Sequence, residues 1–264
     1  MSGPLARDVP VLDRMAENQA HLWCCELNDI VDPAVLQACR DLLTEEEQAR
    51  ADRCHFAKDR KIALVSRAML RSLLARYADV APRGWRFRSN RHGRPEILAP
   101  EHVKDLHFNL SHTDGMVVVL ISKERRLGVD VESVNYRGRC LDIAERFFCR
   151  SECAVLRALP AEEIPARFIA YWTLKEAFVK ACGIGLSLPL NSSAFSIGSG
   201  PERPIACRFS PDLAEKAEQW QFELRNCGHF VVATAIEKGG GESLEVARHQ
   251  WDPAMLSDHA TGAQ

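Results

Sequence analysis

The sequence predicts an α+β fold in which two half-domains of similar topology pack as a pseudo-dimer, with the candidate active site in the crevice between them. The main observation is an internal repeat, since a long helix followed by a turn glycine and an apolar strand occurs twice. A helix predicted over 58–77 precedes GMVVVLIS at Gly115, and a helix predicted over 167–182 precedes GHFVVATAIE at Gly228. Because each unit mixes helical and strand periodicity, each is expected to build one layered half.

We expect a first half over 1–122, a second half over 123–240 and a peripheral tail over 241–264, set off by three consecutive glycines. The 264 residues suffice for a real core, and 46% hydrophobic content is ordinary for a globular protein. No apolar run approaches the roughly 20 residues of a membrane span. The start of the chain carries charges where a signal peptide needs apolar residues, so we expect a cytoplasmic protein without a membrane partner.

The ten cysteines are scattered and show no spacing typical of a zinc site. A chain of this length can build its core without disulfides. We therefore expect reduced thiols, although the even number would permit pairing.

In the first half, residues 21–29 alternate as a strand and a helix is predicted from Pro33 to about 43. Thr44 and Glu47 have the form of a capping box that starts a second helix. The helix over 58–77 carries one apolar stripe. Residues 85–89 alternate as a strand, and the following Asn-Arg-His-Gly-Arg-Pro is turn chemistry. Two strands are predicted over 107–122 around a turn at 113–115, with Ser111 and His112 at the turn.

In the second half, VDVE predicts a strand, and residues 135–142 a loop. One or two short helices follow, with Phe147, Phe148, Val155 and Leu156 expected inside. A central helix is predicted from Pro165 to about Cys182, ended by glycines. Short strands are expected at LSLPL and AFSIG, and a hairpin over 220–236 around Asn-Cys-Gly.

Charge is distributed unevenly along this chain of net charge −2. Residues 50–94 hold thirteen Lys or Arg against three Asp, a balance of +10, and the remainder carries −12. Such a basic segment in a slightly acidic protein indicates a polyanionic ligand, or else solvated helix faces.

Three acidic residues and one lysine are candidates for chemistry. Asp130 and Glu132 project from the same face of their strand because side chains alternate, and Glu176 lies on the central helix one turn before Lys180. Carboxylates that converge repel each other by about 4 kcal/mol at 4 Å and an effective dielectric near 20, unless a cation lies among them. Oxygen ligands favour a hard ion such as Mg²⁺. The alternatives are that the acids pair with arginines, and that Glu176 and Lys180 form a surface pair.

Ser111 and His112 are adjacent, which argues against a Ser–His dyad because neighbours in a strand point to opposite faces. They could both donate to a phosphate, or be structural. Gly93 beside two arginines could likewise let an anionic group approach the backbone, or belong to an ordinary hairpin.

In their order and spacing, FNLSHTDG, LGVDVE and WTLKEAFVKACGIGLSLPL resemble the 4′-phosphopantetheinyl transferases of the surfactin-synthetase-activating type. HFAKDRKIALVSRAMLR is most similar to the broad-specificity members, which have two halves in one chain. The resemblance covers about residues 50 to 195. It implies a Mg²⁺-dependent, monomeric enzyme that moves phosphopantetheine from coenzyme A to a serine of an acyl, peptidyl or aryl carrier protein and releases adenosine 3′,5′-bisphosphate.

The resemblance also implies residue roles. Asp130, Glu132 and Glu176 match the Mg²⁺-binding acids, Glu176 the general base directly or through water, and Lys180 the lysine on the coenzyme A diphosphate. The positions implied to bind coenzyme A are Lys58 near the 3′-phosphate, the turn of Asn90, Arg91, His92, Gly93, Arg94 and Pro95, and the turn of Asn109, Leu110, Ser111 and His112. Arg94 stands where Lys is common, which keeps the charge but changes the geometry.

The helices of carrier proteins are generally acidic, so four arginines are candidates for docking one: Arg137, Arg139, Arg146 and Arg150. Two other functions would fit the same residues. A metal-dependent nuclease also combines Asp-x-Glu with a distal Glu and Lys, and a non-enzymatic nucleic-acid module would use the basic segment with its aromatic residues. If the protein is a transferase, no nucleic-acid partner is expected.

Overall fold

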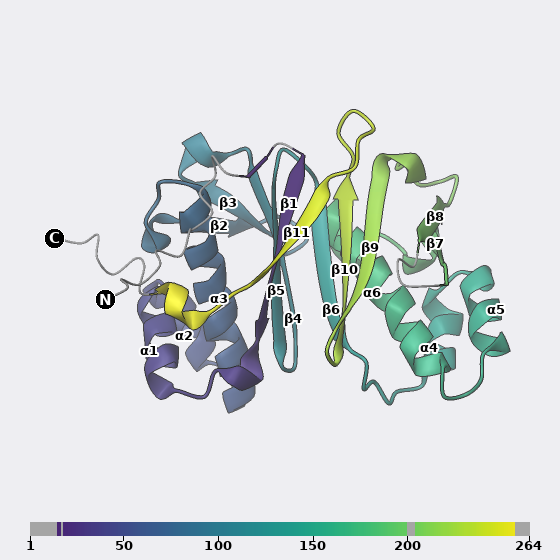
Figure 1. Cartoon of the computed structure of the whole chain (residues 1–264), viewed down its shortest axis with the longest axis horizontal. Helices are drawn as coiled ribbons and strands as arrows, with labels where there is room; N and C mark the ends of the chain where they lie inside the picture. Colours follow the sequence, from purple (N-terminus) through teal and green to yellow (C-terminus); the bar gives the residue numbers. More distant parts are fainter. Residues whose placement is uncertain (1–14, 17, 200–203, 257–264) are drawn as a thin grey trace, which may run out of the picture.

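The computed structural model describes residues 15–16, 18–199 and 204–256 and has four layers. Helix α3 (Ala57–Tyr77) covers the outer face of one sheet, and helix α6 (Ile164–Cys182) covers the outer face of the other. The two sheets face each other in the middle of the molecule (Figure 1).

The first sheet has the strand order β11-β1-β5-β4, and the second has the order β6-β10-β9. The strands of the first sheet are β1 (Gln19–Glu26), β4 (Leu106–Thr113), β5 (Met116–Lys123) and β11 (Glu245–Gln250). Those of the second are β6 (Leu127–Ser133), β9 (Trp220–Cys227) and β10 (Phe230–Glu237). All neighbouring pairs are antiparallel except β1 and β11, which are parallel.

Strand order repeats between the halves, since β1-β5-β4 corresponds to β6-β10-β9. In each half the first strand is followed by helices, a two-stranded sheet and a hairpin. The helices are α1 (Pro33–Asp41), α2 (Glu45–Asp52) and α3, then α4 (Cys140–Phe147), α5 (Arg150–Ala158) and α6. The small sheets are β2 (Arg86–Ser89) with β3 (Pro95–Ala99), and β7 (Ser193–Ile197) with β8 (Ile205–Phe209). The predicted α+β pseudo-dimer is confirmed.

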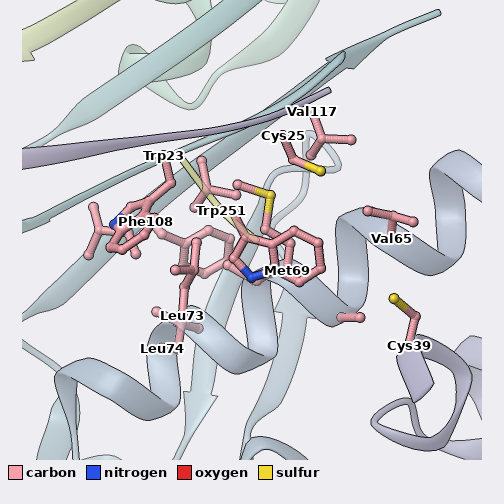
Figure 2. Packing of buried hydrophobic residues seen from close by; sticks show 14 of the residues in the cluster. Trp23, Cys25, Cys39, Val65, Met69, Leu73, Leu74, Phe108, Val117 and Trp251 are labelled. Atoms are coloured by element: carbon pink, nitrogen blue, oxygen red, sulfur yellow. The ribbon is translucent and has the colours of Figure 1, made fainter. Parts of the chain in front are cut away.

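Buried apolar side chains form a cluster between each pair of layers in the described part of the chain. Figure 2 shows the first cluster, in which Met69 and Leu73 of α3 pack against Trp23 and Val117 of the first sheet. The middle cluster joins the two sheets, for example through Leu120 and Val129. Strand β5 is therefore buried on both faces, which explains its continuous apolar run.

Local sequence explains how the helices begin and end. The Asp32 side chain accepts a hydrogen bond from the Ala34 amide at the start of α1, and Thr44 and Glu47 form the predicted capping box of α2. Helix α6 ends at Gly183, whose φ of 70° is accessible without strain only to glycine.

Several expectations are wrong. LSLPL forms two short 3-10 turns instead of a strand, and Ser111 and His112 lie inside β4 rather than at its turn. Phe147 and Val155 are 37% and 40% exposed, whereas Phe148 and Leu156 are buried as predicted. Helices α4 and α5 each bury only one face, and Phe147 and Val155 lie outside these buried faces.

The tail beyond residue 240 is not peripheral. Strand β11 extends the first sheet along β1, and Trp251 is 2% exposed in the core of the first half. Residues 257–264, the last part of the predicted peripheral tail, lie outside the described residues, as do residues 1–14 and 17. Among the residues described, no helix is long and apolar enough to cross a bilayer.

Candidate active site

One ammonium, one hydroxyl and one carboxylate meet where strand β4, strand β6 and helix α6 come together. The Lys180 Nζ lies 2.6 Å from the Asp130 Oδ1 and 2.7 Å from the Ser111 Oγ. The Ser111 hydroxyl donates to the same carboxylate oxygen at 2.9 Å. Because β4 belongs to the first half and β6 and α6 to the second, this triad bridges the two halves.

The second carboxylate oxygen of Asp130 is buried and has no hydrogen-bond partner among the described residues. The Asp130 residue is 4% exposed, and burial raises the pKa of its carboxyl against the opposing effect of Lys180. A buried oxygen without a partner is costly, so it indicates that a further group completes the site.

Glu132 and Glu176 lie within the electrostatic field of Asp130. Burial first and the charge of Asp130 next raise the pKa of the Glu132 carboxyl to about 7, with Glu176 adding to the shift. The same two causes raise the pKa of Glu176. The three acids predicted to act together thus face one region, and each carboxylate raises the cost of ionising another.

These acids do not form a ready metal site. Within 15–16, 18–199 and 204–256, no group of three or more His, Cys, Asp or Glu is placed to hold a metal ion. The Lys180 ammonium lies on the Asp130 carboxylate, where a cation would otherwise bind. The set of Asp130, Glu132 and Glu176 as metal ligands stays a prediction.

A hollow of about 260 Å³ opens beside the triad and collects most of the predicted residues. Both halves line it. From the first half come His92, Gly93, Arg94, Pro95, Asn109 and Leu110, and from the second Glu176, Val179, Lys180, Gly183 and Gly185.

The remaining predicted residues lie elsewhere. Lys58 is exposed and pairs with Asp114 at 2.9 Å, at the end of the β4–β5 hairpin. Arg91 is exposed and donates to the His92 ring. Asn90 is partly buried and shapes the hairpin turn, because its Oδ1 accepts from the His92 and Arg94 amides.

Ser111 and His112 point to opposite faces of β4, so they form no dyad. His112 instead lines a second hollow of about 170 Å³, together with Arg50 and Arg67. The two hollows share Pro95 and Leu110 and are therefore neighbours. The Arg67 Nη1 is buried with no hydrogen-bond partner in the described chain, while its Nε lies 3.3 Å from the Glu47 carboxylate, which also lines this hollow.

Sequence reasoning assigned no role to Arg50, Arg67 or Gly128. The two arginines were visible only as part of the basic segment. Gly128 is the second residue of β6, and a Cβ there would stand 2.1 Å from the Ala177 carbonyl oxygen of α6. A glycine inside a strand is the sequence signal for such a close approach.

Two family models together match most of the chain. The 4′-phosphopantetheinyl transferase superfamily matches residues 126–235, and the 4′-phosphopantetheinyl transferase N-terminal model matches residues 32–125. The chain is 33% identical over 198 residues to the 4′-phosphopantetheinyl transferase HetI of Nostoc sp., covering 75% of this chain and 81% of that protein. It is 28% identical to the human L-aminoadipate-semialdehyde dehydrogenase-phosphopantetheinyl transferase, over 87% of this chain and 76% of that one.

A solved holo-(acyl-carrier-protein) synthase of Bacillus anthracis, in complex with CoA (3′,5′-ADP), matches 43% of this chain and 96% of its own at 18% identity. The TM-score of this match is 0.35. The family matches favour a transferase over a nuclease or a nucleic-acid module. By its sequence relatives, and in agreement with a site shared between two halves, the chain belongs to the 4′-phosphopantetheinyl transferase superfamily and is a transferase enzyme.

Proposed function

We propose that this enzyme transfers 4′-phosphopantetheine from coenzyme A to the hydroxyl of a serine on an apo acyl or peptidyl carrier protein. The observation that carries the proposal is the hollow lined by both halves, with Lys180 and Glu176 from α6 and His92–Pro95 from the β2–β3 turn. Adenosine 3′,5′-bisphosphate is the product left in the hollow.

Coenzyme A is a polyanion with charges at two separated places, and the two adjoining hollows match that pattern. Lys180 in the first hollow supplies a point charge for the diphosphate. Arg50 and Arg67 in the second supply guanidinium groups for the 3′-phosphate. The buried, unpaired Arg67 Nη1 supports this placement.

Asp130, Glu132 and Glu176 supply the hard oxygen ligands that suit Mg²⁺, and the unpartnered Asp130 Oδ2 fits such an ion. When bound, Mg²⁺ neutralises negative charge on the diphosphate. Glu176 takes the proton of the incoming serine hydroxyl, and its raised pKa makes it a stronger base than an exposed carboxylate. The serine oxygen forms a bond to the phosphorus that bears pantetheine. The bond from that phosphorus to the bridging oxygen breaks, and the electron pair leaves with the bisphosphate, beside Lys180.

The test incubates the full chain with coenzyme A, Mg²⁺ and an apo carrier protein and measures the carrier by mass spectrometry. A gain of one phosphopantetheine, lost with a chelator, supports the proposal. Glu176→Gln is expected to lower kcat by about 10²–10⁴-fold, whereas Glu162→Gln on the exposed surface is the matched control. An unmodified carrier together with Mg²⁺-dependent cleavage of a plasmid would favour the nuclease instead.

The carrier protein is proposed to dock on the exposed face of α4 and α5. Arg137, Arg139, Arg146 and Arg150 are all exposed, and Phe147 and Val155 add apolar surface. Reversing the charge of Arg146 and Arg150 should raise KM for the carrier and leave KM for coenzyme A unchanged. Unaltered carrier affinity would remove this face from the proposal.

The chain is further proposed to act as a cytoplasmic monomer. Both halves of the site come from one chain, so no second copy is needed to complete it. Its ten cysteines are all described and are all free.

A further inference from the structure

We propose that Arg94 and Asn90 are positioning residues, which clamp the last turn of α6 to strands β4 and β6 and so hold Lys180 and Glu176 over Asp130. The two residues belong to the β2–β3 hairpin turn, where a contact with coenzyme A was expected. The geometry assigns their polar atoms to the protein instead. The proposal rests on the proposed transfer reaction for its kinetic part only.

The Arg94 guanidinium donates to backbone carbonyls of three different elements. Its Nη1 donates to the carbonyls of Lys180 and of Ala181 in α6, the latter at 3.0 Å. Its Nη2 donates to the Leu127 carbonyl of β6 at 3.0 Å and approaches the Phe108 carbonyl of β4 at 3.5 Å. Helix α6 carries Lys180 and Glu176, strand β6 carries Asp130, and strand β4 carries Ser111. One planar group therefore fixes the relative positions of the three elements.

Asn90 completes the clamp. Its Nδ2 donates to the Gly183 carbonyl at 3.0 Å, just beyond the end of α6. Its Oδ1 accepts from the Arg94 amide at 3.1 Å, so the residue that holds the helix also orients Arg94. A Cβ at Gly183 would make only an ordinary contact with the Arg94 side chain, at 3.5 Å, so the glycine is required here by its φ of 70°.

Helix physics explains why this end needs a partner. The last carbonyls of a helix have no intrahelical donor, and the helix dipole makes this end negative. The Gly183 amide donates to the Val179 and Lys180 carbonyls, and Arg94 and Asn90 donate to Lys180, Ala181 and Gly183. The clamp therefore stabilises the turn that carries Lys180, and it does so from the other half of the molecule.

The same contacts argue against a phosphate ligand as the main partner of Arg94. Both terminal nitrogens already donate to carbonyls, and burial lowers the pKa of the guanidinium without removing its charge at neutral pH. A lysine would keep the charge for a phosphate. Only the planar fork of arginine can reach carbonyls in three elements at once.

The test compares Arg94→Lys and Asn90→Asp with the control Arg86→Lys, which changes an exposed arginine of the same hairpin. Asn90→Asp keeps the oxygen that accepts from Arg94 but loses the Nδ2 donor to Gly183. Hydrogen–deuterium exchange of the protein without ligands is measured over residues 178–186. Faster exchange there in both variants, with the control unchanged, supports the clamp whether or not the transfer reaction is confirmed.

Steady-state kinetics then separate positioning from binding. A clamp predicts that Arg94→Lys lowers kcat by at least about tenfold and changes KM for coenzyme A by less than about threefold, since a small misplacement of Lys180 affects the reaction more than binding. A raised KM with unchanged kcat and unchanged exchange would overturn the proposal and make Arg94 a ligand of coenzyme A. If no variant shows transfer but exchange rises, the clamp stands and the proposed function falls.

Discussion

Each half of the molecule buries a cation of its long helix against a glutamate of the preceding helix. The Arg71 Nε lies 2.9 Å from the Glu47 carboxylate, and the Lys175 Nζ lies 2.9 Å from the Glu152 carboxylate. Both glutamates also cap the start of their own helices, at Thr44 and at Cys149. Both cations donate to carbonyls that lead into the small two-stranded sheet of their half. The repeat therefore includes the buried polar contacts as well as the strand order.

The halves differ at the free edge of their first strand. In the first half, strand β11 pairs along the outer edge of β1, and the Trp251 indole donates to Ser72 of α3 at 3.1 Å. In the second half the outer edge of β6 carries no strand among the described residues. Side chains of the first half bind it instead, since Asn109 accepts from the Val129 amide and Arg94 donates to the Leu127 carbonyl. A strand of the chain thus covers the outer edge of β1, whereas no described strand covers the outer edge of β6, and a ligand can bind there.

The distance between helix and strand differs as well. The sixth residue after the buried cation is Tyr77 in α3 and Ala181 in α6, so these two positions correspond. The pairing of β1 with β5 and of β6 with β10 likewise makes His21 of β1 correspond to Gly128 of β6. His21 and Tyr77 meet through a 2.6 Å hydrogen bond, whereas Gly128 and Ala181 have almost no side chain between them. Small residues let α6 lie directly on β6, and this approach brings Lys180 to Asp130.

The largest expected effect concerns the buried ion pairs. Lys175 and Glu152 are fully buried, so Lys175→Met leaves an unpaired buried charge and should lower the free energy of unfolding by about 3–5 kcal/mol. Arg71→Met should cost less, because the Glu47 side chain is 15% exposed and keeps contact with Arg67. Urea unfolding measures both. Combining Lys175→Met with Glu152→Gln should recover part of the loss. Equal losses in Lys175→Met and Arg71→Met would contradict the expected difference between the two halves.

Gly128→Ala tests the close approach of helix and strand. The new Cβ would meet the backbone of Ala177 and Ala181, so α6 must move away. Overpacking of this kind costs about 1–3 kcal/mol, and a shift of about 1 Å can lower kcat by about 10²-fold. The control Gly84→Ala meets only a side chain, at 3.1 Å from the Val80 Cγ1, and should keep full activity. Normal kcat in Gly128→Ala would show that the approach of α6 does not matter for the reaction.

Asn109→Ala removes the side chain that stands in for a paired strand at β6. The Val129 amide would lose its acceptor at 2.8 Å in a buried position, which should cost about 1–3 kcal/mol. Thermal unfolding of the ligand-free protein measures this. Asn109→Asp keeps an acceptor and should be the more stable of the two variants. If alanine is as stable as asparagine, the open edge of β6 needs no partner.

Local sequence was sufficient for much of the fold. The capping box at Thr44, the Pro at the start of α6 and the glycine at its end act within a few residues, so their effects can be predicted. Strand and helix periodicity placed Asp130 beside Glu132 and Glu176 beside Lys180, and the family resemblance predicted one site for them. The contact between Lys180 and Asp130 was not predicted, since Lys180 was expected on the coenzyme A diphosphate.

Contacts between distant segments were not predictable in this way. Strand β11 has an unremarkable sequence, and its partner β1 lies more than two hundred residues earlier. Strand β8 is short and partly exposed, so it gave no signal. Arg94 looked like a ligand residue because it stands beside a turn glycine, and its carbonyl partners become visible only when the two halves are packed together.

The smallest expected effect is a pH dependence confined to the first half. Burial, and then the neighbouring His249, lower the pKa of His21 to about 4 from an ordinary value near 6.5. The unfolded chain therefore binds more protons than the folded chain between these values, and stability falls as the pH drops through this window. Between pH 7 and pH 5 the loss from His21 should be about 1–2 kcal/mol. Tyr77 and Trp23 contact the same region and stay uncharged in this range. His21→Asn should flatten the difference in unfolding free energy between the two pH values, whereas a slope as steep as that of the parent chain would assign it to other groups. The second half has Gly128 at the corresponding position of β6, so it has no histidine there.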